Sequence, residues 1–320
     1  MLSTTMDDRT ARAALTRLFE PGDTVGLALV AEHGAYTALR IAIGAKPAYP
    51  FGNVTADELS QGLSRWNSSI PGLQPEKDLD EIARLGGGFL IPGDEHWPAT
   101  LDDLDDTPVG LWYRGNIELG IPAQDKAVAL IGSRDCTSYG ASVTSDLAHG
   151  LAQRGITIIA GLAYGVEERA HAAALAGAKD GLPATIAVVA NGLNRDYPAG
   201  NATTAEAIRA KGLILSEMPP GSAPTRQRFL ARSRIIATLA GVTCVVEARS
   251  RSAALSTARL ASTLGRGVAA LPGSVHSANS WGAHSLIKDG TAALVTDIED
   301  LVEMLAIDPN KRADAQEPVR

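Results

Sequence analysis

The stretch from Val128 to His171 reads VALIGSRDCTSYGASVTSDLAHGLAQRGITIIAGLAYGVEERAH, and its order of apolar runs and glycines decides the fold. The apolar run Val128–Ile131 has the length of a strand and is followed at once by a glycine turn. Residues 139–154 then carry apolar side chains at a four-residue spacing, which is typical of one helical face. The β-branched run Ile156–Ala160 predicts a second strand, and the turn Gly161–Gly165 separates it from another helix. This order predicts a parallel βαβ unit, because parallel strands need a long crossover connection.

The two glycine turns of this unit predict a phosphate-binding site. The carboxyl ends of neighbouring parallel strands lie at one edge of an open α/β sheet, where such folds bind ligands. Gly132, Gly161 and Gly165 let backbone N–H groups approach an anion, and the helices that follow add positive potential at their N-termini. Ser133 and Arg134 complete the first turn, and a guanidinium suits phosphate. The alternative is that these glycines only make tight turns. The spacing differs from GxGxxG, so neither NAD nor FAD is expected.

Composition and cysteine usage favour a cytoplasmic protein. The 320 residues suggest two domains, or one large α/β domain with an appendage. Cys136 and Cys244 lie far apart without a CxxC partner, which argues against a disulfide framework and against a zinc site. The N-terminus lacks the layout of a signal peptide. The longest apolar run, Ile235–Val246, is too short to span a bilayer, so no membrane association is expected.

The charges are unevenly distributed along the chain, whose net charge is −7. Residues Glu76–Asp106 contain ten acids and two bases, whereas Arg226–Arg266 contain eight arginines and the single acid Glu247. This asymmetry indicates a localised anion-binding face on an acidic protein. The alternative is that the arginines pair with acids elsewhere in the fold.

The α/β alternation continues beyond the first unit. Further strands are predicted at Thr185–Ala190, Leu213–Leu215, Val242–Val246, Gly267–Leu271 and Ala292–Val295. Further helices are predicted around Thr203–Lys211, Arg226–Leu239, Ser252–Leu264 and Asp297–Leu305. Before the core, residues 8–44 read as helical, 46–75 as a linker with a short helix near Ala56–Trp66, and Asp78–Leu85 as a helix.

Short motifs follow one another in a fixed order over much of the chain. They are Gly132-Ser133-Arg134 with Tyr139-Gly140, Ala160–Gly165 with Ala170-His171, Asn191–Leu193 with Tyr197-Pro198 and Asn201, Ser216-Glu217, Pro219–Gly221, Phe229, Arg232, Arg234–Ile236, Val246–Ala248, Thr257-Ala258, Gly265-Arg266, Pro272-Gly273, Leu286-Ile287 and Asp289-Gly290. The segment Ile91–Asn116 looks like the region before the Rossmann-like domain of one family. From about Asp78 to Leu305 the series resembles the DprA/Smf family of DNA-processing proteins.

The resemblance implies a Rossmann-like domain that binds single-stranded DNA as a homodimer, acts in DNA uptake and natural transformation, and helps to load a RecA-type recombinase. It implies no catalytic turnover. From the residue spacing, no cofactor and no metal are expected. The positions that match the family's DNA pocket are Gly132, Ser133, Arg134, Gly161, Gly165, Asn201, Phe229, Arg232, Arg234 and Ser252. Arg226 and Arg228 are predicted as further phosphate contacts.

The chain departs from the family pattern at several of these motifs. Glu167 stands where the family has Asp, and the Phe-Pro-x-Arg-Asn-Arg motif has lost its Pro and its Asn, the latter to Ser233. Ser252-Ala253-Ala254 replaces Ser-Gly-Ser, and Ala202 replaces a basic residue. No winged-helix segment is expected after the core. These differences predict a divergent member whose ligand or partner differs.

Several single residues have competing interpretations. Arg134 could form a structural salt bridge, and one of Arg232 and Arg234 could pair with an acid such as Glu247 while the other faces the pocket. His171 lies four residues after Glu167, and we expect a hydrogen-bonded structural histidine rather than an acid–base pair.

Two other functions compete with DNA binding. One is a nucleotide-ligand sensor or hydrolase related to LOG-like Rossmann proteins, although their PGGxGTxxE motif is absent and Ser250–Thr257 is a distant counterpart at most. The other is a protein-interaction role in which the arginine-rich segment docks on an acidic partner. We predict a Rossmann-like, mostly parallel doubly wound sheet over residues 76–306, with its core from about 126. A helical region and linker precede it over 1–75, and a polar, disordered tail follows over 307–320.

Overall fold

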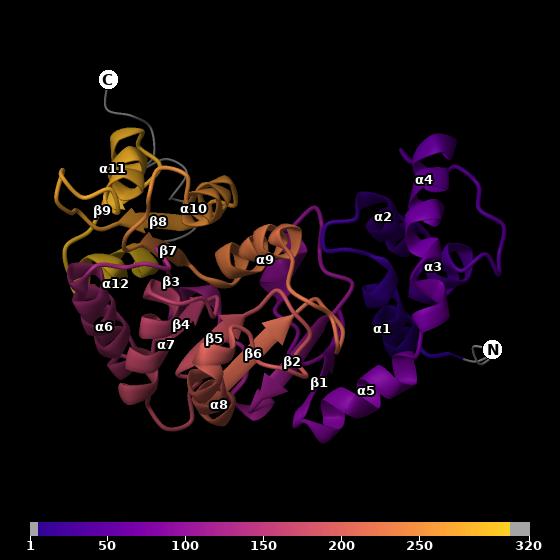
Figure 1. Cartoon of the computed structure of the whole chain (residues 1–320), viewed down its shortest axis with the longest axis horizontal. Helices are drawn as coiled ribbons and strands as arrows, with labels where there is room; N and C mark the ends of the chain where they lie inside the picture. Colours follow the sequence, from indigo (N-terminus) through magenta and orange to yellow (C-terminus); the bar gives the residue numbers. More distant parts are fainter. Residues whose placement is uncertain (1–5, 308–320) are drawn as a thin grey trace. The chain divides into compact units, whose positions relative to one another are not determined.

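The computed structural model describes residues 6–307 and contains the predicted α/β alternation (Figure 1). The strands are β1 Gly87–Leu90, β2 Leu111–Gly115, β3 Ala127–Ile131, β4 Thr157–Ala160, β5 Thr185–Val188, β6 Gly212–Ser216, β7 Val242–Val245, β8 Gly267–Ala270 and β9 Ala293–Leu294. The α-helices are α1 Asp8–Leu18, α2 Thr24–His33, α3 Ala35–Ala42, α4 Ala56–Asn67, α5 Pro75–Arg84, α6 Ser138–Gln153, α7 Val166–Ala176, α8 Ala202–Lys211, α9 Arg226–Leu239, α10 Ala253–Thr263, α11 Trp281–Lys288 and α12 Ile298–Ala306.

The strands form one nine-stranded, mostly parallel sheet in the order β1-β2-β6-β5-β4-β3-β7-β8-β9. The predicted βαβ unit is confirmed, since β3 and β4 are parallel neighbours with Val128 opposite Ile158. On its other side β3 is parallel to β7, with Leu130 opposite Cys244. The strand order therefore reverses between β3 and β7, and this reversal is the point at which open α/β sheets hold ligands.

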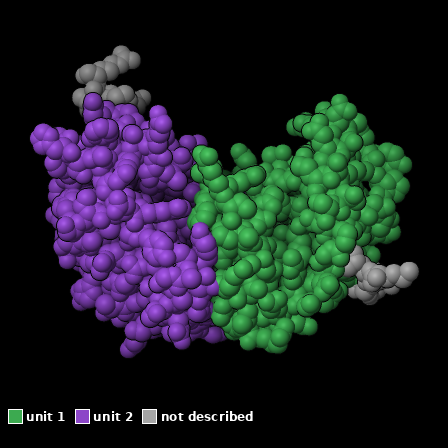
Figure 2. All heavy atoms as spheres, viewed as in Figure 1, with its two compact units in different colours: residues 1–114, 190–195, 215–231 green, residues 115–189, 196–214, 232–320 purple. Residues whose placement is uncertain are grey.

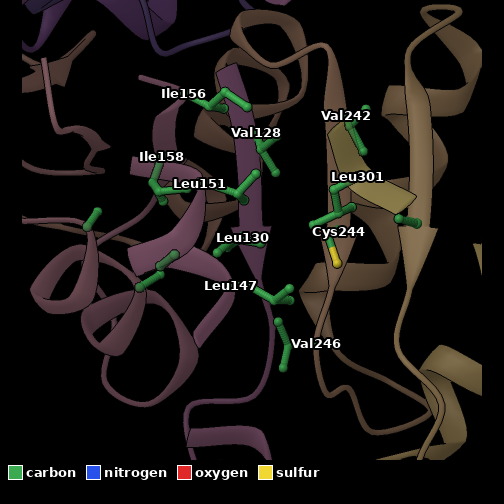
Figure 3. Close-up of a cluster of buried hydrophobic side chains, with 14 of the residues drawn as sticks. Val128, Leu130, Leu147, Leu151, Ile156, Ile158, Val242, Cys244, Val246 and Leu301 are labelled. Atoms are coloured by element: carbon green, nitrogen blue, oxygen red, sulfur yellow. The ribbon is translucent and has the colours of Figure 1, made fainter. Parts of the chain in front are cut away.

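Helices cover both faces of the sheet around this reversal. Successive strand residues point to opposite faces, so Leu130 and Cys244 point toward α6 while their neighbours point away from it. Figure 3 shows side chains of β3, β7 and α6 gathered in this cluster, with Leu301 of α12 beside them. Helix α10 packs against β7 and β8, and Figure 1 shows α10 and α11 on the other side of the sheet from α6 and α7. The carboxyl ends of β3 and β7 thus emerge from a close-packed core.

The N-terminal helices form a second hydrophobic core, and the short helix predicted near Ala56–Trp66 is present as α4. Within residues 46–75, α4 starts with a capping box between Thr55 and Glu58. It buries Leu59 and Trp66 in the cluster formed by α1, α2 and α3. The Trp66 indole also donates to Asp23, the N-cap of α2, at 2.8 Å. Two large apolar side chains seven residues apart on one helical face anchor a segment whose glycines and prolines suggested a linker.

The chain divides into two compact units (Figure 2). Unit 1 comprises residues 1–114, 190–195 and 215–231, and unit 2 comprises 115–189, 196–214 and 232–320. The predicted boundary at residue 75 does not coincide with this division, because α5, β1 and β2 belong to unit 1. Most of the tail predicted from residue 307 lies outside the described residues. Over residues 6–307, no helix combines the length and the apolar character needed to cross a membrane.

Candidate functional site

The two glycine turns of unit 2 touch each other at the carboxyl edge of the sheet. The Val166 amide, at the start of α7, donates to the Ser133 carbonyl at 3.1 Å. Gly165 has φ +82°, and a Cβ there would lie 2.6 Å from the Arg134 carbonyl oxygen. Only glycine permits both this backbone conformation and this approach. The prediction that the turns lie side by side is confirmed.

The first turn presents its arginine and buries its serine. Arg134 is exposed after β3. The Ser133 hydroxyl is used within the turn, because it donates to the Asp135 carbonyl at 3.0 Å and accepts from the Asp135 amide. The Ser133 amide donates to the Glu247 carbonyl at 2.7 Å, and a Cβ on Gly132 would be 2.7 Å from that same oxygen. Arg134 is therefore the charged group that this turn offers to a ligand.

A side-chain carboxylate, that of Glu247, already occupies the N-terminus of α6. Glu247 is buried just after β7, and its carboxylate accepts from the Thr137 amide at 2.8 Å and from the Thr137 hydroxyl at 2.6 Å. Gly140 leaves the room that this carboxylate fills. Burial, reinforced by Glu247, raises the pKa of the Cys136 thiol and of the Tyr139 phenol. The positive helix end that we expected to attract phosphate is thus neutralised by Glu247.

The second turn is fastened from inside by an ion pair. Arg232 of α9 is only 9% exposed and donates to the Val188 carbonyl at 2.9 Å and to both Glu167 oxygens at 3.2 Å. Glu167 also accepts from the Ala163 amide at 2.9 Å. The guanidinium lies against Gly161, where any Cβ would overlap it. Arg232 thus pairs with Glu167, whereas the Glu247 carboxylate accepts from Thr137.

His171 supports the same turn, as a structural histidine. It is fully buried, with Nδ1 2.6 Å from the Thr185 hydroxyl and Nε2 hydrogen-bonded to the Gly161 carbonyl. Burial lowers its pKa to about 4, so the ring is neutral at pH 7 and Nε2 carries the proton that it donates. The expectation of a hydrogen-bonded histidine is confirmed.

The other predicted positions are divided between the two units. Asn201 is buried and donates to the Leu162 carbonyl at 3.0 Å, so it too belongs to the second turn. Ser252 is the N-cap of α10 and accepts from the Ala254 amide. Arg234 is buried in unit 2. Arg226, Arg228 and Phe229 lie in the part of α9 that belongs to unit 1.

The arginine-rich segment is not a uniform basic face, since most of its arginines are buried or paired. Three are buried, namely Arg232, Arg234 and Arg266. Three pair with acids: Arg228 with Glu20 at 2.6 Å, Arg249 with Asp135 at 3.1 Å and Arg259 with Asp289 at 3.7 Å. Arg226 and Arg251 are exposed and have no ion pair among the described residues. Within the described part of the chain, the pairing that we considered as an alternative therefore accounts for much of the asymmetry.

Two exposed residues near the turns were missed by sequence reasoning. Tyr164 lies at the tip of the second turn and is 51% exposed. Arg169 lies on the exposed face of α7, within electrostatic reach of Cys136, and has no ion pair among residues 6–307. An aromatic between two glycines directly after a strand was the available signal for Tyr164. No cluster of potential metal ligands occurs in the described ranges.

Known proteins are similar to this chain both in sequence and in fold. A family model described as DNA recombination-mediator protein A matches residues 88–306. A relative from Mycobacterium tuberculosis is 41% identical over 239 residues, which cover 71% of this chain and 60% of the relative. The DNA processing protein DprA of Streptococcus pneumoniae is 40% identical over 210 residues, covering 65% of this chain and 71% of that protein. The chain thus spans about 60% of the length of the mycobacterial relative.

Two solved structures show the same architecture. The X-ray structure of Streptococcus pneumoniae DprA matches with a TM-score of 0.72 at 29% identity and covers 96% of this chain and 100% of that one. DNA processing protein A of Helicobacter pylori, solved for its single-stranded DNA binding mode, matches with a TM-score of 0.59 at 31% identity. That match covers 66% of this chain and 94% of the other. The resemblance is confirmed, and the chain belongs to the DNA recombination-mediator protein A family, the DprA/Smf proteins.

Proposed function

We propose that this chain binds single-stranded DNA and acts in DNA uptake, natural transformation and recombination. The observation that carries the proposal is the exposed Arg134 on a turn that packs against the second glycine turn, beside the strand-order reversal. An exposed guanidinium at the ligand-binding edge of an α/β sheet suits a phosphate diester. The single-stranded DNA binding mode described for the Helicobacter pylori relative supports the same ligand.

The direct contacts that we propose come from the exposed parts of the predicted site. Arg134 binds a phosphate, with the backbones of Gly132 and Gly161–Gly165 beside it. Ser252 remains a candidate at the start of α10, and Arg251 next to it adds an exposed charge that has no ion pair among the described residues. Arg226, Arg228 and Phe229 remain candidates on unit 1, where Arg228 would first have to leave Glu20.

The proposal has three finer parts, which the resemblance to the DprA/Smf family suggests. The chain acts as a binding protein without turnover, it forms a homodimer, and it delivers the strand to a RecA-type recombinase. Each of these parts can be tested separately from DNA binding, and each can be wrong while the chain still binds DNA.

The test is fluorescence anisotropy of a labelled oligonucleotide over a salt series, with duplex DNA and mononucleotides as competitors. We expect binding that prefers single strands and weakens as salt rises, with a slope of log K against log salt of about −0.7 per phosphate contacted. Arg134→Gln should weaken binding and make that slope shallower by about 0.7, because it removes one phosphate contact.

Arg40→Gln is the matched control, since Arg40 is an exposed arginine on α3 of unit 1. It should leave both affinity and slope unchanged. Failure to bind any strand at low salt, with a mononucleotide still raising the melting temperature, would favour the nucleotide-sensor alternative. Binding of an acidic protein that survives Arg134→Gln would favour the protein-interaction alternative.

A further inference from the structure

We propose that Tyr164 stacks on a nucleobase of the bound strand, and that Arg232 is a positioning residue that supports this tyrosine instead of binding phosphate. The inference rests on the DNA binding proposed above and names the chemical group that the second turn recognises. A nucleobase offers a flat π-face whatever its identity, so an exposed aromatic ring can bind it without sequence preference.

Tyr164 is placed where a passing base would meet it. It lies at the tip of the turn after β4, next to the turn that carries Arg134, and half of its surface is exposed. Its ring also rests on the backbone of Gly200, because a Cβ on Gly200 would lie 2.6 Å from the Tyr164 hydroxyl and 3.1 Å from Cε1. The ring is therefore supported from one direction and open to solvent in another.

Two hydrogen bonds hold the backbone that leads into Tyr164. His171 donates to the Gly161 carbonyl, and Asn201 donates to the Leu162 carbonyl at 3.0 Å. Asn201 and Gly200 belong to the same 3-10 turn, Ala199–Asn201, so one segment fixes both the turn and the ring. A side chain held in its binding position loses little conformational entropy when the ligand arrives.

Arg232 completes this support through Glu167. Glu167 accepts from the Ala163 amide, the residue directly before Tyr164, and the two Glu167 oxygens accept from Arg232. Arg232 also donates to the Val188 carbonyl and has a side chain that is only 10% exposed. A phosphate would reach this guanidinium only after these contacts were broken. The geometry therefore assigns Arg232 to the turn.

The first experiment compares a normal oligonucleotide with an abasic strand of the same length, which keeps every phosphate. Tyr164→Leu removes the ring, and we expect it to weaken binding of the normal strand about tenfold. Binding of the abasic strand and the salt slope should not change. Tyr164→Phe keeps the ring and should bind like the wild type. Tyr49→Leu is the control, because Tyr49 is 72% exposed on unit 1.

The second experiment uses Glu167→Gln, for which the two roles of Arg232 predict opposite signs. If Arg232 positions the turn, weakening the ion pair lowers affinity for the normal strand and leaves the salt slope and abasic-strand binding unchanged. If Arg232 binds phosphate, removing its carboxylate partner raises affinity and steepens the slope. The melting temperature of each variant shows whether the chain is still folded.

The outcomes separate this inference from the proposed function. A wild-type chain that binds no strand contradicts both. A wild-type chain that binds strands, but loses no affinity through Tyr164→Leu or loses it equally for normal and abasic strands, overturns the stacking role alone. Tighter binding by Glu167→Gln overturns the positioning role of Arg232.

Discussion

The first and second glycine turns lie side by side, yet the arginine beside each has a different role: Arg134 of the first turn is exposed, whereas Arg232 of α9 is buried behind the second. The first turn exposes Arg134, and a buried carboxylate, Glu247, neutralises the helix behind it. Behind the second turn, Arg232 is buried and pairs with Glu167, while Tyr164 of the turn is exposed. Two glycine turns that each follow a parallel strand therefore offer different chemistry, a cation from one and an aromatic ring from the other. The second turn has no arginine of its own, and the arginine that α9 places behind it is buried.

The largest expected difference between the turns comes from removing the inward arginine. Arg232→Met should lower the free energy of unfolding by about 3–5 kcal/mol, because it leaves the Glu167 carboxylate buried without its cation. The measurement is urea unfolding followed by circular dichroism. Arg249→Gln is the control beside the first turn, since its ion pair with Asp135 is solvent-exposed and should be worth less than about 1 kcal/mol. Equal losses for the two variants would contradict the distinction between the turns.

The contact between the turns can be tested at Gly165. Gly165→Ala should cost about 3 kcal/mol, since a Cβ at φ +82° is strained and also meets the Ser133 and Arg134 carbonyls. Gly181→Ala imposes similar strain at φ +76°, but into open space, and should cost only about 1–2 kcal/mol. Thermal and urea unfolding of the two variants give the difference. If both lose the same amount, the turns do not press on each other as described.

Lowering the pH should reduce the stability of the folded chain through His171, which supports the second turn. The folded pKa of about 4 lies below the ordinary value of 6.5, so the unfolded chain binds more protons and the stabilisation is complete only above pH 6.5. It is lost as the pH falls from 6.5 toward 4. Between pH 7.5 and pH 5 the wild type should lose about 2 kcal/mol more than His171→Gln, which has no titrating ring. Parallel pH profiles for the two proteins would show that His171 is not held neutral.

Sequence patterns predicted the α/β core because its signals are local. The apolar run Val128–Ile131, the four-residue spacing that follows and the β-branched run after it each correspond to an element within one or two residues. Helix α11 was not predicted, because its eight residues bury only Gly282, Ala283 and Leu286 and so show little periodicity. Helix α4 was predicted near Ala56–Trp66, but its packing into a hydrophobic core was not, because its burial depends on partners distant in sequence.

The candidate site was predicted by position, while the roles of its residues were not. The motifs located both turns, and their adjacency follows from the crossover rule. Whether an arginine points outward, as Arg134 does, or inward, as Arg232 does, depends on acids from other elements. Glu167 lies on α7 and Glu247 follows β7, and nothing local to either arginine indicates which carboxylate it will meet. The outward direction of Tyr164 was equally undetermined.

Because the Glu247 carboxylate occupies the start of α6, the site does not need a ligand to assemble. Glu247 is part of the chain, so the helix end keeps its counter-ion whatever the anion concentration outside. The loops after β3 and β7 are therefore assembled before any ligand arrives. On the proposed function, the arrival of a strand would then be limited by diffusional encounter and electrostatic steering, and its departure by the outward contacts.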